Sequence, residues 1–283
     1  MHKKHYIALL GALAVGLFQV RAQTATTAPT ASTPAAPAPA AAAPAAPAAP
    51  SWSWTLTPSY ASVYMFRGQR LGGQSFQPSL TGTYGNWTTE IWTSVPVNHA
   101  NLVVGQSDPE VDPSAIYTEA INDSFNVQAG ATLYTYLDAP TASGFYKATF
   151  EPQIGVNYTV AGLTINPKYY YDLVLATATY EGNLSYSIPV KELGTSLNLA
   201  ISVGTYYGTN VVNGSHPKTH AWGDYYSYGV STPYTITKNS VLTIGVAFTE
   251  GSGAFFKQPG SPKSANTAAV RRTPITVSYA WTF

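Results

Sequence analysis

The chain has 283 residues, of which 45% are apolar and 13% aromatic but only 10% charged, against about 25% charged in an average soluble domain. It contains no cysteine, which excludes disulfide frameworks, thiolate metal sites, cysteine nucleophiles and a lipidated cysteine anchor. The three Lys and Arg residues of the first 22 belong to a segment that we expect to be removed, and the remainder is weakly acidic. This balance gives no electrostatic case for nucleic-acid binding.

Residues 1–22 have the layout of a secretory signal peptide. A basic patch, His2–His5, precedes an apolar run from Tyr6 to Val20, and Val20 and Ala22 have the spacing that suits signal peptidase. The apolar run is too short to span a membrane comfortably as a helix. We therefore expect export and removal of this segment.

Residues 23–50 consist almost entirely of Ala, Pro, Thr and Ser. They offer nothing large to bury, and the prolines favour polyproline II, so we expect a disordered spacer. At ~3.1 Å per residue it could reach ~90 Å. It either contacts peptidoglycan or only holds the following domain away from the processing site, and the second interpretation is the simpler one.

Residues 51–283 predict one all-β domain, because apolar residues alternate with polar or small ones and no amphipathic helix is found. In the last segment, large apolar side chains at every second position share one face: Ile275, Val277, Tyr279, Trp281 and Phe283. A strand that ends on a terminal Phe283, preceded by Tyr279 and Trp281, resembles the C-terminal signal that the assembly machinery of bacterial outer-membrane barrels reads.

The pattern predicts twelve strands, an even number. They are expected over residues 53–66, 75–84, 86–97, 113–122, 125–136, 146–157, 162–171, 175–187, 194–205, 221–235, 239–249 and 272–283. Short turns alternate with connections that are mostly longer, as in a closed antiparallel barrel of the outer membrane. Closure also leaves no unpaired strand edge in lipid, where each exposed polar group costs several kcal/mol.

The two faces of the predicted strands differ in polarity. Apolar residues at alternate positions are expected to face lipid, as in 242–248 and 197–203. Clusters near strand ends, such as Trp52 with Trp54, Tyr169–Tyr171 and Tyr225–Tyr228, are typical of the aromatic girdles at the two membrane interfaces.

Several motifs between residues 52 and 122 resemble those of one family. They are Tyr64-Met65-Phe66-Arg67-Gly68, Gln74–Leu80, Trp87–Trp92, and Glu110-Val111-Asp112 before Ala115 and Tyr117. The chain in this region is similar to the TorF family of porin-like outer-membrane β-barrels, in which one strand ends in Phe-Arg-Gly and a later one reads Glu-x-Asp-x-x-Ala-x-Tyr. The resemblance implies an outer-membrane barrel and a channel.

Charged residues on the polar faces are the candidate pore lining. A charge on the lipid face near the midplane costs up to a few kcal/mol, so these side chains must face the lumen or a rim. The set is Arg67, Glu90, Lys147, Glu151, Lys168 and Glu181. They either line a narrow polar pore or pair with one another and plug it, because so small a barrel has little free lumen.

An acidic cluster precedes the fourth predicted strand. Asp108, Glu110 and Asp112 recur at every second position, so an extended backbone would place them on one side, where they could hold Ca²⁺ or attract cations. A solvated loop is the simpler interpretation. The register also has two solutions: the family resemblance turns Glu110 and Asp112 inward, whereas the strand's own alternation turns Glu119 inward.

Evidence for an enzyme is thin. Only His99, His216 and His220 follow the signal segment, all in predicted outer loops, and no Gly-x-Ser-x-Gly, paired metal-binding histidines or phosphate loop occurs. We therefore expect no catalytic residues and no cofactor.

The chain is interpreted as an exported outer-membrane barrel of a Gram-negative bacterium that passes small hydrophilic solutes or ions by diffusion. Its expected partners are outer-membrane lipid, those solutes and the barrel assembly machinery. A plugged barrel with a structural or binding role is the main alternative. An outer-membrane hydrolase and a soluble secreted β-protein are the remaining ones.

Overall fold

The computed structural model describes residues 51–97, 109–139, 147–209, 220–251 and 271–283. They form one closed antiparallel β-barrel of twelve staves, as the alternation and the even count predict. Two staves each consist of two consecutive strands, β1 with β2 and β5 with β6. Fourteen labelled strands therefore make the twelve staves. Among these residues no helix has the length and apolar character needed to cross a bilayer.

The strands of the wall have the following bounds: β1 Ser53–Thr57, β2 Ser59–Ala61, β5 Ser75–Phe76, β6 Ser79–Tyr84, β7 Trp87–Pro96, β8 Glu110–Asn122, β9 Phe125–Tyr136, β10 Ala148–Val160, β11 Leu163–Asp172, β12 Thr177–Val190, β13 Thr195–Thr209, β14 His220–Thr237, β15 Ser240–Gly251 and β16 Ile275–Thr282. A short 3-10 turn, η3 (Lys191–Leu193), joins β12 to β13. Two further strands, β3 (Tyr64–Phe66) and β4 (Gln69–Gly72), form a separate sheet.

The barrel closes where the first and last staves meet. Strand β16 pairs with β1 and β2 on one side and with β15 on the other. Trp54 and Phe283 exchange two backbone hydrogen bonds of 3.1 and 2.9 Å at this seam. Closure satisfies the backbone groups that an open edge would leave unpaired.

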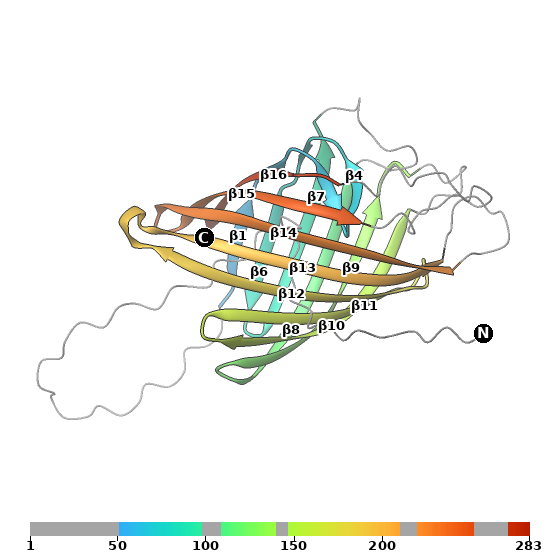
Figure 1. Cartoon of the computed structure of the whole chain (residues 1–283), viewed down its shortest axis with the longest axis horizontal. Coiled ribbons are helices and arrows are strands. Elements are labelled where there is room, and N and C mark those ends of the chain that lie inside the picture. Colours follow the sequence, from blue (N-terminus) through green and yellow to red (C-terminus); the bar gives the residue numbers. More distant parts are fainter. Residues whose placement is uncertain (1–50, 98–108, 140–146, 210–219, 252–270) are drawn as a thin grey trace, which may run out of the picture.

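Connections at the two ends of the barrel differ in length, as predicted. At one end, called here the short-turn end, staves are joined by tight turns such as Ala161–Gly162, in which both residues have positive φ, the geometry of a type I′ hairpin turn. The turns from β8 to β9, β10 to β11 and β12 to β13 lie together at this end (Figure 1). The opposite end, called the long-loop end, carries the longer connections, with Leu173–Ala176 as a short exception.

The outer face of the wall is apolar and exposed. In β15, Ile244 and Val246 are 46% and 39% exposed, while Gly245 and Ala247, at the alternate positions, are buried. Strand β16 repeats the pattern, with Tyr279, Trp281 and Phe283 on the outside. These observations confirm the predicted lipid faces.

Aromatic side chains gather on the outer face near the short-turn end. The Trp52 ring lies 5.2 Å from the rings of both Trp54 and Tyr84, and the rings of Trp281 and Phe283 lie 4.9 Å apart. This arrangement is typical of an aromatic girdle. The prediction was wrong for Tyr170 and Tyr225, which face the lumen and form hydrogen bonds there.

The first predicted strand was too long. The wall strand ends at Ala61 rather than at residue 66, because Ala61 pairs with Ser75 of the next stave. Ser62 and Gln74 still bond to the neighbouring strands, and residues 63–73 leave the wall between them. The fourth strand was predicted too short, since β8 begins at Glu110 rather than at residue 113.

Candidate functional site: the lumen and its inserted hairpin

The segment that leaves the wall folds as a tight hairpin of β3 and β4. Phe66 pairs with Gln69, so Arg67 and Gly68 are the two turn residues. Both have positive φ, 46° and 73°, which defines a type I′ turn. Glycine adopts this conformation freely, but an arginine at the first position is strained. The same backbone occurs at Ala161 in the turn from β10 to β11, so the strain belongs to the turn type and not to the arginine side chain.

Inward-facing side chains of many staves contact the hairpin, so it lies inside the lumen. The Tyr64 hydroxyl donates a hydrogen bond of 2.9 Å to Glu110 on β8, and its ring lies 5.5 Å from that of Trp92 on β7. On the other side of the barrel, Gln69 is fully buried and donates to the Tyr206 hydroxyl on β13 at 3.3 Å.

The turn of the hairpin packs directly against β14 and β15. A Cβ added at Gly68 would stand 2.6 Å from the Gly251 Cα and 2.7 Å from the Tyr225 Cβ. No larger residue fits this position without displacing the backbone of one of the two segments. Glycine is therefore required at position 68 both by the positive φ and by the close approach of the backbone to the wall.

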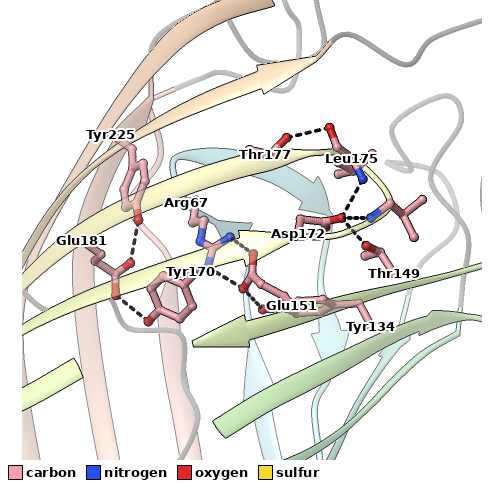
Figure 2. Close-up of polar contacts among 11 residues, drawn as sticks. Arg67, Tyr134, Thr149, Glu151, Tyr170, Asp172, Leu175, Thr177, Glu181 and Tyr225 are labelled. Atoms are coloured by element: carbon pink, nitrogen blue, oxygen red, sulfur yellow. Dashed lines mark hydrogen bonds and ion pairs between the residues drawn. The ribbon is translucent and has the colours of Figure 1, made fainter. Parts of the chain in front are cut away.

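An ion pair fixes the tip of the hairpin to β10 (Figure 2). The Arg67 guanidinium donates two hydrogen bonds, of 2.7 and 2.8 Å, to the two carboxylate oxygens of Glu151. Glu151 also accepts a hydrogen bond of 3.0 Å from the Tyr134 hydroxyl. The two charged side chains are 11% and 3% exposed, and such bidentate pairs are among the stronger polar contacts in proteins.

Aromatic rings enclose the Arg67 guanidinium. Its carbon lies 4.7 Å from the centre of the Phe66 ring and 4.5 Å from that of Tyr170, within the range of cation–π attraction. The hairpin leaves the wall between the first and second staves, whereas Glu151 lies on the sixth. Arg67 therefore reaches across the lumen to the opposite wall.

Two further carboxylates near the tip are held by uncharged donors (Figure 2). Glu181 on β12 accepts hydrogen bonds from the hydroxyls of Tyr170 and Tyr225, at 3.1 and 2.6 Å, and from the Asn183 amide at 3.0 Å. Asp172 accepts from the Thr149 hydroxyl and from the backbone amides of residues 174 and 175. These donors hold the carboxylates in place without adding positive charge.

Toward the short-turn end the wall carries a row of neutral polar groups, which we call the amide ladder. The Asn157 amide donates to Asn126 at 2.7 Å and the Asn166 amide donates to Asn157 at 2.7 Å. The Asn183 amide donates to Asn166 at 3.4 Å, and the Ser202 hydroxyl donates to Asn183 at 2.6 Å. The ladder joins β9 to β13 across their inner faces.

The predicted pore-lining residues do not all occupy the same region. Arg67 and Glu151 meet at the hairpin tip, and Glu181 lies beside them. Glu90 and Lys168 face the lumen on β7 and β11, half-buried; Glu90 accepts a hydrogen bond of 3.5 Å from Thr81. Lys147 precedes β10 at the long-loop rim and is exposed.

The acidic cluster is not a solvated loop over the part that the structure describes. Glu110 and Asp112 lie in β8 with exposures of 2% and 1%, facing the lumen. Glu119 is exposed on the outer face, where it accepts hydrogen bonds from Tyr117 and Asn86. The register implied by the family resemblance is therefore correct. A shift in pairing between Ala120 and Asn122 separates this register from the end of the strand.

Some predicted site residues lie outside the described residues: Asp108, His99 and His216, together with the side chain of His220. In the described part of the chain, no group of three or more His, Asp or Glu side chains is placed to hold a metal ion.

Several lumen residues escaped the sequence analysis, chiefly Tyr64, Gln69, Trp92, Tyr134 and Tyr206. They are aromatic or neutral, so the search for charged residues passed over them. One signal was available: Phe66-Arg67-Gly68-Gln69 places glycine at the second position of a possible two-residue turn.

Solved structures that match this chain include two porins and LpxR. The porin NanC has a TM-score of 0.51 at 11% identity, over 81% of this chain and 98% of its own. The KdgM porin has a TM-score of 0.47 at 12% identity, over 81% and 99%, and LpxR from Salmonella typhimurium 0.47 at 7% identity, over 81% and 100%. No protein-family model and no curated protein sequence matches the chain. The chain shares the barrel fold of a porin.

Proposed function

We propose that the chain is an outer-membrane channel for the passive diffusion of small hydrophilic solutes or ions. The observation that carries the proposal is the closed barrel of twelve staves with an apolar, girdled exterior and an interior of hydroxyl, amide and charged groups. An exterior of this kind suits lipid, and a polar interior suits water and solutes. Arg67, Glu90, Lys147, Glu151, Lys168 and Glu181 are the proposed charged lining.

The hairpin of β3 and β4 sets the width of the proposed path. It crosses the lumen and is anchored to the far wall through Arg67 and Glu151. A solute must pass beside it, so the free cross-section at the level of Glu151 limits both conductance and solute size.

Single-channel recording in planar bilayers tests the proposal. The purified, detergent-folded protein should produce discrete conductance steps, and the heat-unfolded sample should produce none. Heat-modifiable gel migration verifies folding in each preparation. Folded protein that produces no conductance steps would contradict the proposed channel function.

A plugged barrel is the second candidate, and the same hairpin favours it. If the hairpin and its aromatic neighbours seal the lumen, the folded protein is silent, and its loops or spacer serve a structural or binding role. A variant without the hairpin distinguishes the two candidates, because only a sealed barrel changes from silent to conducting.

Finer assignments remain part of this proposal. We infer membership of the TorF family, export by residues 1–22 to the bacterial outer membrane, and assembly through the terminal Tyr279, Trp281 and Phe283. Removal of Phe283 should lower the yield of assembled barrel in cells, whereas Trp52→Ala, a change in the same girdle, should not.

We further infer that the chain is not an enzyme. Phospholipid and peptide substrates should remain intact in its presence. Hydrolysis that is lost in both His216→Ala and His220→Ala would support the hydrolase alternative instead.

A further inference from the structure

The lumen carries more negative than positive side chains. Six carboxylates of the wall face it: Glu90, Glu110, Asp112, Glu151, Asp172 and Glu181. Among the described residues, three cations lie between the rims, Arg67 and Arg70 on the hairpin and Lys168 on β11. The described lumen therefore holds a formal excess of three negative charges.

Charges at the long-loop rim do not cancel this excess. Lys147 and Arg272 stand there, and Asp138 offsets one of them. Counting these rim residues still leaves two more carboxylates than cations. The remaining described charges lie on the outer face or in the turns; Glu250 and Arg271, for example, pair with each other at 3.1 Å and are 32% and 67% exposed.

The excess is spread along the path rather than gathered at one point. Glu110 and Asp112 lie near the long-loop end of β8, Glu181 lies beside the hairpin tip, and Glu90 lies three residues from the short-turn end of β7. Glu181 receives its hydrogen bonds from tyrosine hydroxyls and an amide, which stabilise a carboxylate without neutralising it.

We propose that this channel selects cations over anions, with small hydrophilic cations as its solute class. The inference rests on the proposed function and deepens it. A narrow lumen with low-dielectric walls concentrates the field of its fixed charges, so that a net negative interior raises the local concentration of cations and depletes anions. Rings of Asp and Glu give cation selectivity to other pores by the same physics.

The first test is the reversal potential under a KCl gradient at neutral pH. The wild-type channel should be more permeable to potassium than to chloride by a factor of about three or more, as expected for a net charged narrow pore. Glu90→Gln combined with Glu181→Gln should lower this ratio at least about twofold, because two of three excess charges are removed. The matched control Glu250→Gln, on the outer face, should leave the ratio unchanged. A ratio at or below one in the wild type would overturn the inference.

The second test uses the absence of cysteine from the chain. Ser114 faces the lumen beside Glu90 in the pairing of β8 with β7 and is only half-buried. In Ser114→Cys, a positively charged methanethiosulfonate should react faster than a negatively charged one of similar size, after each rate is normalised to its reaction with a free thiol. Glu90→Gln in the same background should reduce the preference.

The two tests separate failure of the inference from failure of the channel. Mass spectrometry measures the labelling rate even in a barrel that does not conduct. A silent barrel in planar bilayers would contradict the proposed function, whereas equal labelling rates, or faster labelling by the anionic reagent, would overturn cation preference by itself.

Discussion

Near the long-loop end of the lumen, charged and aromatic side chains hold an inserted hairpin. Toward the short-turn end, amides and hydroxyls bond mainly to one another along the wall, with Asn183 also donating to Glu181. The first region contains the buried ion pair of Arg67 with Glu151. The second is the amide ladder across β9 to β13. Most hydrogen bonds of the ladder thus join neutral groups. The buried charged anchor of the hairpin therefore points to a role beyond holding the wall together.

Removing the hairpin should give the largest effect. Because Ala61 pairs directly with Ser75, residues 62–74 can be replaced by Asn-Gly, which forms a two-residue turn between paired strands. The wall stays closed while the lumen loses the element that crosses it. Single-channel conductance should rise several-fold, and the amide ladder should remain intact.

Two outcomes of that deletion are informative. A variant that migrates as a folded barrel but conducts no better than the wild type would contradict the hairpin as the limiting element. A variant that conducts where the wild type is silent would establish the plugged barrel as the native state.

Breaking the anchor should have the largest effect on stability. Arg67→Ala leaves the Glu151 carboxylate buried without its cation, which costs about 3–5 kcal/mol in comparable buried pairs. The free energy of unfolding, followed in urea by heat-modifiable gel migration, should fall by an amount in that range.

The matched control removes both charges. Arg67→Met with Glu151→Met replaces the pair by apolar groups and should cost less than Arg67→Ala alone, since no uncompensated charge remains. A double variant as unstable as the single one would show that shape, and not charge, anchors the hairpin.

Much of the wall could be predicted because alternation is a local signal. The outward positions around Ile244, the terminal face of Tyr279, Trp281 and Phe283, and the alternating connections follow from a period of two. The hairpin could not be predicted in the same way. Tyr64 and Phe66 continue the alternation of the first strand, so nothing local distinguishes a strand in the wall from one inside the barrel.

The candidate site was predicted in part for the same reason. Inward positions such as Glu151 and Glu181 follow from parity, but their partners do not. Arg67 and Glu151 are 84 residues apart in the chain, and they meet only because the barrel closes around the hairpin. Tyr170 and Tyr225 are tyrosines near strand ends, as girdle residues are, and only the register of their strands places them in the lumen.

Two tyrosine rings pack over glycines of the neighbouring strand, and substitutions at these glycines should give a loss of stability of intermediate size. Tyr225 lies over Gly204 of β13, where an added Cβ would stand 2.0 Å from a ring carbon, and Tyr206 lies over Gly223 of β14 at 2.3 Å. Both rings are 2% exposed and cannot move away without displacing the hairpin. Gly204→Ala or Gly223→Ala should cost about 1–3 kcal/mol by overpacking, measured by the same urea titration.

Gly72→Ala is the control for that prediction, because its added Cβ would meet Tyr64 at an ordinary 3.5 Å. It should cost less than either of the other two. Equal losses from all three would indicate that the tyrosine rings are free to shift.

The amide ladder should show the smallest effect. Asn166 donates to the Val156 carbonyl and to Asn157, both at 2.7 Å, and accepts from Asn183. Asn166→Ala removes these bonds, but the site is only half-buried and water can replace the lost partners, so the cost should be about 1 kcal/mol. Conductance should change little, because the bonds of Asn166 run along the wall to β10 and β12 and none of them reaches the hairpin. A loss of stability as large as that of Arg67→Ala would instead mean that the two regions of the lumen act as one network.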